Sequence, residues 1–425
     1  MTSSRRLFLT GLTGTAALPM GLTKAANASD NNGLAELIEK AIQAGGSLEL
    51  PPGDYIASGI RIDRGLTIAG QGERTRLIST DDRPIFTIAA TEAVTLRSLS
   101  FSGPALARDA ALVTATRSHG LLIDRCRFSD SPAGGLHLEG CGGAVTGCHF
   151  SRIATTALFA RDSTGLDISG NRLEDIGNNG IQVWTSEPAE DGTRVTSNHI
   201  LRVAAKAGGS GQNGNGINVY RAGNVIVTGN RISDCAFSAI RNNSGSACLI
   251  ADNAISRIAE VAIYCEFGFE GAVVSGNILN DVALGISITN FNEGGRLAAV
   301  TGNVIHKVTG GGSLDYTRGV GIAAEADTAI TGNVIDGAAD TGISLGWGGY
   351  SRNLSATGNV LRDCAIGIGF SVTGGAGPVL VANNRISGSR IGSIMGTDHG
   401  RPVTQDLAHG GADVTQGIIS GNLAD

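Results

Sequence analysis

The sequence predicts an all-β fold, a single-stranded right-handed parallel β-helix with three short strands per coil and an N-terminal capping helix. The first observation is a motif that recurs along most of the chain, at intervals of 22 to 38 residues. The second is a composition with 64 glycines, nine prolines and 4% aromatic residues. Repeats of this length in a turn-rich chain are typical of solenoids, in which each repeat packs on its neighbours. We expect about 13 coils, which at about 4.8 Å per coil give a column of roughly 60 Å.

The recurring motif has two alternating apolar residues, then Gly-Asn, then two further apolar positions. One copy reads Leu166-x-Ile168-x-Gly170-Asn171-x-Leu173-x-x-Ile176. Alternating apolar residues predict strands with one buried face, and asparagine tolerates the left-handed backbone that a sharp bend between strands requires. Asparagines stacked at one corner can hydrogen-bond to one another along the stack. We therefore expect one ladder formed by Asn171, Asn198, Asn230, Asn253, Asn277, Asn303, Asn333, Asn359 and Asn384.

A third strand follows in each coil and is marked by a glycine and then alternating apolar residues. Examples are Gly180-Ile181-x-Val183 and Gly342-Ile343-x-Leu345. Three strands in a repeat of this length indicate a parallel β-helix. A leucine-rich repeat would instead show a Leu-x-x-Leu-x-Leu signature, which the sequence lacks.

The N-terminal region predicts a leader followed by a cap. Ser4-Arg5-Arg6-Leu7-Phe8-Leu9, an apolar stretch and Ala26-Asn27-Ala28 together form a twin-arginine signal peptide over residues 1–28. We therefore expect a periplasmic or secreted protein whose β-helix domain covers residues 29–425. Residues 29–46 form its cap, because residues 34–42 have helical periodicity, and residues 47–425 form the coils. No later segment is apolar enough to predict a membrane span.

The mature chain is acidic. The whole chain has 32 basic and 38 acidic residues, and removal of Arg5, Arg6 and Lys24 with the leader leaves 29 basic residues. This balance argues against a nucleic-acid scaffold, which needs a basic face.

The seven cysteines indicate core positions more than a disulfide framework. Cys235 and Cys364 stand where other repeats have buried isoleucine or valine, so we expect small core residues there. Cys126 and Cys148 take the asparagine position in successive coils. They would lie one strand spacing apart, so a disulfide between them is within geometric reach. No cysteine or histidine set has the spacing of a zinc site.

Two segments near the N-terminus carry a resemblance to a known superfamily. They are Gly45-Gly46-Ser47-Leu48-Glu49-Leu50-Pro51-Pro52-Gly53-Asp54-Tyr55 and Leu66-Thr67-Ile68-Ala69-Gly70-Gln71-Gly72. They resemble the opening of the pectate-lyase-like right-handed β-helix superfamily, and the whole chain is similar to twin-arginine-exported repeat proteins of proteobacteria. The resemblance implies a substrate groove along the outer face of the third strand. It does not imply one reaction, because this fold serves many functions.

The outward residues of the third strands predict where ligand would bind. Side chains alternate across a strand, which gives two outward rows that are richest in polar and aromatic residues between positions 182 and 266. Aromatic rings stack on the apolar faces of sugars, and amide and guanidinium groups bind their polar substituents. We therefore expect an elongated cleft lined by these two rows, with substrate-binding residues Gln182, Trp184, Asn218, Tyr220 and Asn243.

Three further residues on two adjacent coils are candidates for catalysis. Arg241 would pair with a uronate carboxylate, Tyr264 would move a proton, and Glu266 would bind metal or orient the sugar. The chain lacks the catalytic motifs of polygalacturonases, pectate lyases and mannuronan epimerases. Two hypotheses therefore stay open: a polysaccharide lyase, epimerase or hydrolase, and a non-catalytic glycan-binding or cell-surface structural β-helix. No cofactor is implied, although the acidic run Glu187, Glu190 and Asp191 offers oxygen ligands suited to calcium.

The residue after each repeat asparagine should point outward. In the first half of the chain these residues are charged or histidine, but in four later coils they are Ile278, Val304, Val334 and Val360. Four stacked β-branched residues would form an apolar stripe, and soluble proteins seldom leave such a stripe bare. Homo-oligomerisation through the stripe, its coverage by turns, and simple exposure are the three alternatives.

Overall fold

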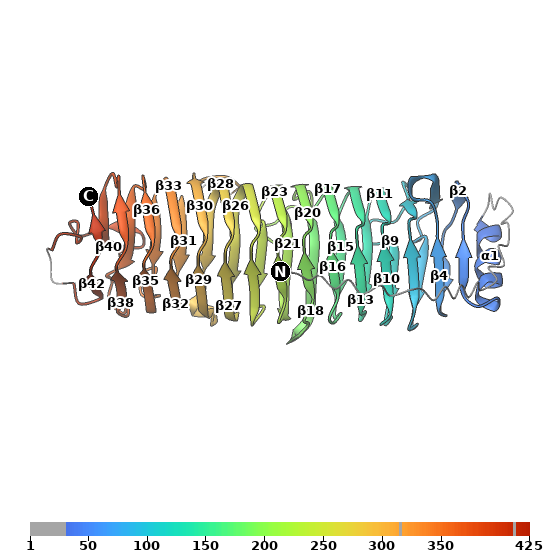
Figure 1. Cartoon of the computed structure of the whole chain (residues 1–425), viewed down its shortest axis with the longest axis horizontal. Coiled ribbons are helices and arrows are strands. Elements are labelled where there is room, and N and C mark those ends of the chain that lie inside the picture. The colour runs from blue at the N-terminus through green and yellow to red at the C-terminus, as the bar shows by residue number, and fades with distance from the viewer. Residues whose placement is uncertain (1–30, 314–316, 411–413) are drawn as a thin grey trace, which may run out of the picture.

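The computed structural model describes residues 31–313, 317–410 and 414–425. The predicted signal peptide, residues 1–28, lies outside the described residues. The chain forms one elongated column of stacked coils, with helix α1 (Asn31–Gln43) over its N-terminal end (Figure 1). Leu34, Ile38 and Ala41 of α1 are buried against the first coil, as expected of a capping helix. The predicted right-handed parallel β-helix with an N-terminal cap is confirmed.

Each coil contributes three strands, and the first strands form a 15-stranded parallel sheet. The column therefore has slightly more coils than the 13 predicted. These strands are β1 (Ser47–Glu49), β4 (Leu66–Ala69), β7 (Val94–Arg97), β10 (Leu121–Asp124), β13 (Gly143–Thr146), β16 (Asp167–Ser169), β19 (Arg194–Thr196), β22 (Ile226–Thr228), β25 (Cys248–Ala251), β27 (Glu270–Ser275), β29 (Arg296–Thr301), β32 (Ala326–Thr331), β35 (Arg352–Thr357), β38 (Val379–Ala382) and β42 (Gly417–Ser420).

The second strands follow the corner after the first strands. They are β2 (Gly53–Ile56), β5 (Thr75–Ile78), β8 (Ser100–Ser102), β11 (Arg127–Ser131), β14 (His149–Ile153), β17 (Arg172–Ile176), β20 (His199–Val203), β23 (Arg231–Cys235), β30 (Val304–Val308), β33 (Val334–Ala338), β36 (Val360–Arg362), β39 (Arg385–Ser387) and β43 (Leu423–Ala424). In two coils the second and third strands run on without a break, as β26 (Ala254–Glu266) and β28 (Ile278–Ile288).

The third strands carry the face that the sequence predicts to bind ligand. They are β3 (Ile60–Ile62), β6 (Phe86–Ala89), β9 (Ala111–Thr116), β12 (Gly134–Glu139), β15 (Thr156–Arg161), β18 (Asn179–Glu190), β21 (Asn215–Gly223), β24 (Ile240–Asn243), β31 (Val320–Ala324), β34 (Thr341–Leu345), β37 (Ile366–Ser371) and β40 (Gly392–Asp398). The two-residue strand β41 (Arg401–Pro402) pairs antiparallel with β40. Two short 3₁₀ helices, η1 (Gly72–Arg74) and η2 (Phe291–Glu293), lie in turns.

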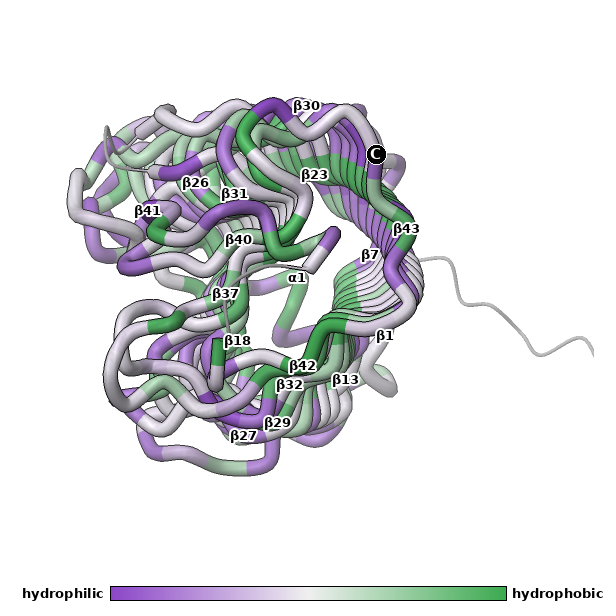
Figure 2. The backbone as a smooth tube through the Cα atoms, turned by 90° about the vertical axis from the view of Figure 1, so that its left-hand side faces the viewer, coloured by the Kyte–Doolittle hydropathy of each residue, from purple (hydrophilic) through white to green (hydrophobic). Residues whose placement is uncertain are grey.

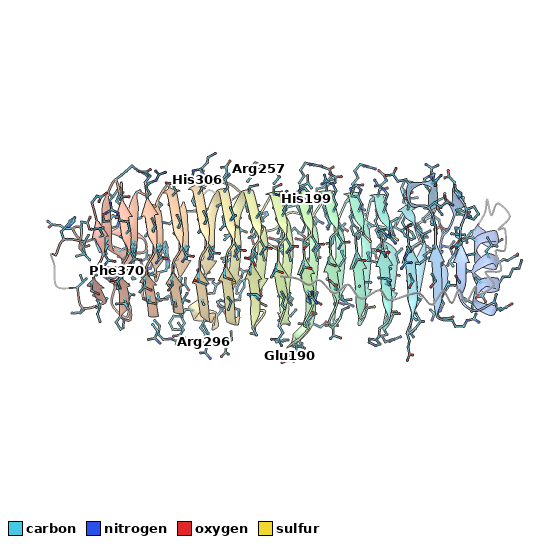
Figure 3. All side chains as sticks on the ribbon, in the orientation of Figure 1. Glu190, His199, Arg257, Arg296, His306 and Phe370 are labelled. Carbon is cyan, nitrogen blue, oxygen red and sulfur yellow. The ribbon has the colours of Figure 1, made fainter. Side chains whose placement is uncertain are left out.

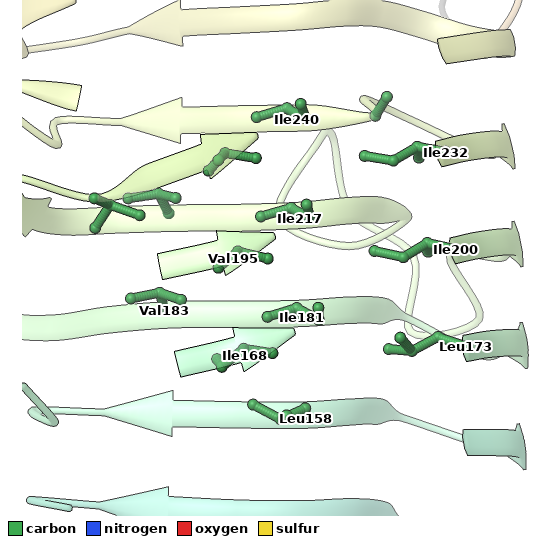
Figure 4. Packing of buried hydrophobic residues seen from close by; sticks show 14 of the residues in the cluster. Leu158, Ile168, Leu173, Ile181, Val183, Val195, Ile200, Ile217, Ile232 and Ile240 are labelled. Carbon is green, nitrogen blue, oxygen red and sulfur yellow. The ribbon is translucent and has the colours of Figure 1, made fainter. Parts of the chain in front are cut away.

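The interior is filled by like residues stacked in register. Nine isoleucines of consecutive third strands pair in one row, from Ile181 to Ile394. Figure 4 shows Ile181, Ile217 and Ile240 of this row above one another. Near the N-terminal end, the rings of Phe101, Phe128 and Phe150 stack with centroids 5.0 and 4.7 Å apart. Such stacks bury each apolar side chain on both faces, which favours a continuous core along the column.

The predicted asparagine ladder is present from Asn171 to Asn384 and continues to Asn422. In a typical rung, the side-chain Oδ1 of Asn277 accepts hydrogen bonds from the backbone N–H and the Nδ2 of Asn253, both at 3.0 Å. Its Nδ2 donates to Ile250 O at 3.1 Å and to the Oδ1 of Asn303 at 2.9 Å. The amides from Asn171 to Asn384 are buried and fully bonded, so the ladder fixes one corner of each coil that carries it.

A second ladder, of charged residues, lies within the second strands at positions with positive φ. Aspartate and a basic residue alternate there from coil to coil: Arg152 bonds Asp130 at 2.6 Å, and Arg257 bonds Asp234 at 2.7 Å. Figure 3 labels Arg257 on the upper edge of the column. Alternation prevents like charges from stacking one strand spacing apart, although each exposed pair contributes little stability.

All seven cysteines are buried free thiols. Cys126 and Cys148 are not bonded to each other; each Sγ instead donates to a backbone carbonyl, at 3.4 Å in both cases. Burial raises the pKa of the Cys126 thiol well above its ordinary value. The core-residue interpretation of the cysteines therefore holds, and the disulfide alternative does not.

The apolar stripe points outward as predicted. Ile278 is 58% exposed, and Val304, Val334 and Val360 are 42 to 45% exposed. Turns of the described chain therefore do not cover it. None of the helices in the described part of the chain has both the length and the apolar character needed to cross a lipid bilayer.

Candidate active site

The outer face of the third strands is lined by long turns on both sides. In the end-on view of Figure 2, these turns project to the left as an upper and a lower group. In the first half of this face, four rings form an aromatic strip: His137, Phe159, Trp184 and Tyr220. Neighbouring ring centroids are 4.9, 5.3 and 5.2 Å apart. The four partly exposed rings lie on four successive coils, so the strip is three coil spacings long, or about 14 Å.

Two of the predicted substrate-binding residues do not lie on an open surface. Gln182 and Asn218 are only 6% and 4% exposed. The Oε1 of Gln182 accepts a hydrogen bond from the Thr156 hydroxyl at 2.8 Å. Asn243 donates its Nδ2 to Glu266 at 2.9 Å. The polar groups of Gln182 and Asn243 are therefore used inside the protein.

The three predicted catalytic residues lie together, around the guanidinium group of Arg241. Its Nε donates to Glu266 Oε1 at 2.6 Å, and its Nη1 donates to Gly211 O at 2.8 Å. The same Nη1 lies 3.5 Å from Glu260 Oε2. The Tyr264 ring centroid is 5.2 Å from the guanidinium carbon. Arg241 is thus shared by two carboxylates of its own chain, which leaves it poorly placed to pair with the carboxylate of a substrate.

Glu260 is part of this cluster, and the sequence prediction missed it. It lies in the segment that joins the second and third strands within β26, outside the two outward rows of the third strands. Its Oε2 accepts a hydrogen bond from the Ser238 hydroxyl at 2.6 Å. The signal in the sequence is an acidic residue within the otherwise apolar run Ile258-Ala259-Glu260-Val261-Ala262-Ile263. A charged residue in such a run is buried at a cost that function often explains.

Burial changes the proton affinity of every acidic group in the cluster. It raises the pKa of Glu260 and of Glu266, and the neighbouring Arg241 opposes the rise at both. Burial, reinforced by the Glu266 carboxylate, raises the pKa of Tyr264 to about 12. Tyr264 is therefore a phenol at neutral pH that can donate a hydrogen bond. The predicted role of a proton-abstracting tyrosine does not fit this environment.

A cleft of about 390 Å³ opens directly beside this cluster. It lies over the coils that carry Tyr264, Ser287, Ala323 and Ser344, further toward the C-terminus than the sequence predicts. Of the five predicted substrate-binding residues and the three predicted catalytic residues, only Arg241 and Tyr264 line it. The other residues that matter chemically are Ser210, Glu260, Thr289, Asn290, Thr317, Arg318, Glu325 and Trp347.

Glu325 is the second acidic side chain that faces the cleft. Its Oε2 accepts a hydrogen bond from the backbone N–H of Phe291 at 2.8 Å. Burial raises its pKa, and only backbone hydrogen bonds from Phe291 and Asn290 oppose the rise. No cation is among the groups that oppose this rise, in contrast to Glu260, where Arg241 opposes it.

Both arginines that line the cleft are already paired. Arg241 is shared by Glu260 and Glu266, and Arg318 donates its Nε to Asp340 at 2.5 Å. The Arg318 guanidinium also lies 5.5 Å from the Trp347 ring centroid. Neither arginine that lines the cleft is therefore unpaired, so the cleft offers no free cation to an anionic ligand.

The described residues contain no group of three His, Cys, Asp or Glu side chains that could hold a metal ion. In the acidic run considered for calcium, Glu187 and Glu190 are exposed while Asp191 is buried and accepts the Thr193 N–H at 2.9 Å. The three carboxylates therefore do not converge.

Comparison with known proteins gives a family match over part of the chain. The model of a family described as "Periplasmic copper-binding protein (NosD)" matches residues 87–264, which is less than half of the chain. No curated protein matches the sequence. The copper of the family description does not fit the residues present, because all seven cysteines are buried and no group of three His, Cys, Asp or Glu side chains forms in the part of the chain that the structure describes.

Solved structures show the same fold at low sequence identity. The N-terminal fragment of bacteriophage Phi29 gene product 12 is 12% identical, with 91% of this chain and 67% of that chain covered, at a TM-score of 0.52. The Streptococcus pneumoniae surface protein and adhesin PfbA is 11% identical, with 92% and 96% covered, at 0.47. The catalytic domain of a GH87 α-1,3-glucanase in complex with nigerose is 14% identical, with 93% and 67% covered, at 0.47. The chain has a right-handed parallel β-helix fold, and the likeness to these structures carries no further than the fold.

Proposed function

We propose that this β-helix protein is an exported enzyme that hydrolyses a neutral polysaccharide in the cleft between Arg241 and Trp347. The observation that carries the proposal is a pair of glutamates, the buried Glu260 and the half-buried Glu325, that face one cleft with raised pKa values and different surroundings. Enzymes that hydrolyse glycosidic bonds use two carboxyl groups in different protonation states.

The surroundings of the two glutamates suggest their roles. Glu325 has no cation beside it and is suited to give its proton to the oxygen of the leaving sugar. Glu260 lies 3.5 Å from the Arg241 guanidinium, which opposes the rise of its pKa, and we assign it the role of taking a proton from water. The water hydroxyl then joins the anomeric carbon as the carbon–oxygen bond to the leaving sugar breaks. Arg241 and Glu266 position Glu260, and Tyr264 is placed to donate a hydrogen bond to the sugar.

The pairing of both cleft arginines favours a neutral glycan. A uronic-acid lyase or epimerase has to neutralise the carboxylate of its substrate before a C5 proton can leave. Arg241 and Arg318 are already bonded to Glu266 and Asp340, so a uronate would meet acidic neighbours without a free cation. A neutral sugar avoids this repulsion and can stack on Trp347.

The proposed export of the protein would bring it into contact with polysaccharides outside the cytoplasm. The predicted twin-arginine leader and the periplasmic location in the description of the matching family agree on the compartment. The glucanase among the structural neighbours binds nigerose according to its description, but its fold similarity is too low to identify the substrate of this chain.

The test is a screen of the purified mature protein. Glucans with α-1,3, α-1,4, β-1,3 and β-1,4 linkages, together with alginate and pectin, are incubated with the protein. New reducing ends and absorbance at 235 nm are then measured. We expect new reducing ends from a neutral glycan and no rise at 235 nm. An absorbance rise with alginate or pectin would show a lyase and overturn the proposal.

A second candidate function is glycan binding without turnover, and the aromatic strip favours it. Changing Trp184 and Tyr220 together to alanine should weaken oligosaccharide binding by about 1–3 kcal/mol per lost ring, by analogy with base–aromatic stacking. The measurement is isothermal titration calorimetry with each glycan that binds the parent protein. Phe267→Ala, at an exposed ring outside the strip, is the matched control. Unchanged affinity in the double variant, with folding intact, would exclude the strip as a binding surface.

Self-association through the apolar stripe is a further proposal that can be tested. Changing Val304 and Val334 to glutamate places two charges in the middle of the stripe, which should halve the mass of a dimer in light scattering. The exposed residue Thr331 lies on the neighbouring first strand, and Thr331→Glu serves as a control. A parent protein that is already monomeric would leave self-association without support.

A further inference from the structure

The cleft is closed at its C-terminal end. Arg318 precedes the third strand β31, whereas Trp347 follows the third strand β34, so the two residues approach from opposite sides of the strand face. They meet over that face, and the tip of the β40–β41 hairpin contacts both. His399 packs edge-on against the Trp347 ring at 5.6 Å, and Gly400 O accepts a hydrogen bond from Arg318 at 3.2 Å. This bridge lies across the path that a glycan would follow along the third-strand face.

The cleft is also closed at its N-terminal end. The loop between β20 and β21 places Ser210 at the cleft wall and Gly211 O against the Arg241 guanidinium. Arg241 itself is 8% exposed, and Gln182 and Asn218 in the two preceding coils are buried. The outward row that would have continued the groove is therefore filled by the protein's own side chains.

The two remaining sides are walls built by the segments that flank the third strands. Glu260, Val261 and Thr317 line the cleft from segments that precede third strands, and Asn290 and Gly346 line it from segments that follow them. The floor spans four coils, a length of about 14 Å at the usual strand spacing. Such a recess has room for a few sugar units and an opening only toward solvent.

We propose that the recess takes the end of a neutral glycan chain, or the end of a branch, and that the enzyme releases short products from that end. This inference rests on the proposed function and names the mode of attack. A chain that crosses an active site in its middle needs two open ends of the groove, and this site has neither. The aromatic strip lies outside the recess, on the same face of the column, where it would hold the part of the polymer that does not enter.

The test follows product size over time. The polymeric probes are soluble β-1,3-glucan and dextrin. The short probes are glucose oligosaccharides of two to six units with α-1,3, α-1,4, β-1,3 or β-1,4 linkages, and each oligosaccharide is labelled at its reducing end. We expect one short product size from the earliest time points, with the viscosity of the parent polymer nearly constant. An early mixture of product sizes with a fall in viscosity would overturn the inference and leave hydrolysis established. Neither binding nor turnover with any probe would overturn the proposed function as well.

Opening the closed end provides a second arm. The double variant Arg318→Ala/His399→Ala removes the bridge beside Trp347. It should raise the share of products released from within the chain several-fold. The His399 side chain is 59% exposed, so the single variant His399→Ala should fold. It can therefore be tested in place of the double variant if the double variant does not fold. Asp398→Asn keeps the bridge and is the control. An unchanged product pattern in both alanine variants would show that the bridge does not set the mode of attack.

Discussion

Replacing Glu325 with glutamine is expected to lower the rate of glycan hydrolysis by about 10²–10⁴-fold, because the leaving sugar loses its proton donor. Glutamine keeps the oxygen that accepts the Phe291 N–H, so the turn beside the cleft should hold its shape. Glu260→Gln should cause a loss of similar size by removing the base. The measurement is kcat/KM on the glycan identified in the screen.

The pH profile separates a proton donor from a merely structural glutamate. Because burial raises the pKa of Glu325, the activity of the parent protein should persist above the ordinary glutamate range and fall as pH rises through that raised value. In Glu325→Gln this alkaline limb should be absent from the residual activity. Glu293→Gln, at an exposed glutamate in the η2 turn that contains Phe291, should retain activity within about twofold, as is usual for exposed positions.

Stability should change in the opposite direction to activity. A carboxyl group with a raised folded-state pKa stabilises the protein fully below the pKa of the unfolded chain, and this contribution is lost as pH rises through the folded-state value. Glutamine has no charge to bury. Glu325→Gln should therefore melt at a higher temperature than the parent protein at pH 7.5, with the difference shrinking toward pH 4. Full activity in Glu325→Gln, or the same alkaline limb in both proteins, would exclude Glu325 as the proton donor.

The fold could be predicted because its determinants are local and repeated. Each coil from Asn171 onward carries its own corner asparagine, and the partner of Asn277 is another asparagine 26 residues later in the same position. A pattern of this kind needs no knowledge of the tertiary structure, since each repeat meets only the next one. The outward direction of the Val304 side chain could be predicted in the same way, because side chains alternate between the two faces of a strand.

The candidate site was only partly predictable, because turns rather than strands decide where the surface is open. The rows placed Arg241, Tyr264 and Glu266 correctly on adjacent coils. They could not show that the loop carrying Gly211 would cover Arg241, nor that Gln182 and Asn218 would be buried. The course of such a loop depends on tertiary contacts, and its glycine-rich sequence is compatible with many conformations.

Glu260 is a cleft residue that the repeat pattern could not predict. It belongs to a connecting segment, and it faces the cleft only because β26 runs through the corner without a turn. Arg318 and Trp347 likewise meet across the face from turns of different coils. Their contact depends on turn lengths that vary along the chain, so the periodic pattern cannot predict this contact.

The asparagine ladder gives the largest expected effect on stability. Changing Asn277 to alanine should lower the free energy of unfolding by about 3 kcal/mol. The reason is that Asn253 loses the acceptor of two buried hydrogen bonds, and Ile250 O loses a donor. The corner is buried on both sides by neighbouring coils, so water cannot replace these bonds without separating them. The measurement is urea unfolding followed by circular dichroism.

Two further variants distinguish lost hydrogen bonds from lost volume. Asn277→Asp keeps the acceptor but turns a second oxygen toward Ile250 O and the Asn303 amide oxygen, both of which are acceptors. Burial should raise the pKa of the new carboxyl group, so its protonated form is favoured in the folded state and the stability of this variant should fall as pH rises. Asn280→Ala, three positions along at an exposed site whose side chain bonds only His306, should change stability by no more than about 0.5 kcal/mol. If Asn277→Ala unfolds at the same urea concentration as Asn280→Ala, then the ladder adds nothing to the hydrophobic stacks, and the corner asparagines serve only to bend the chain.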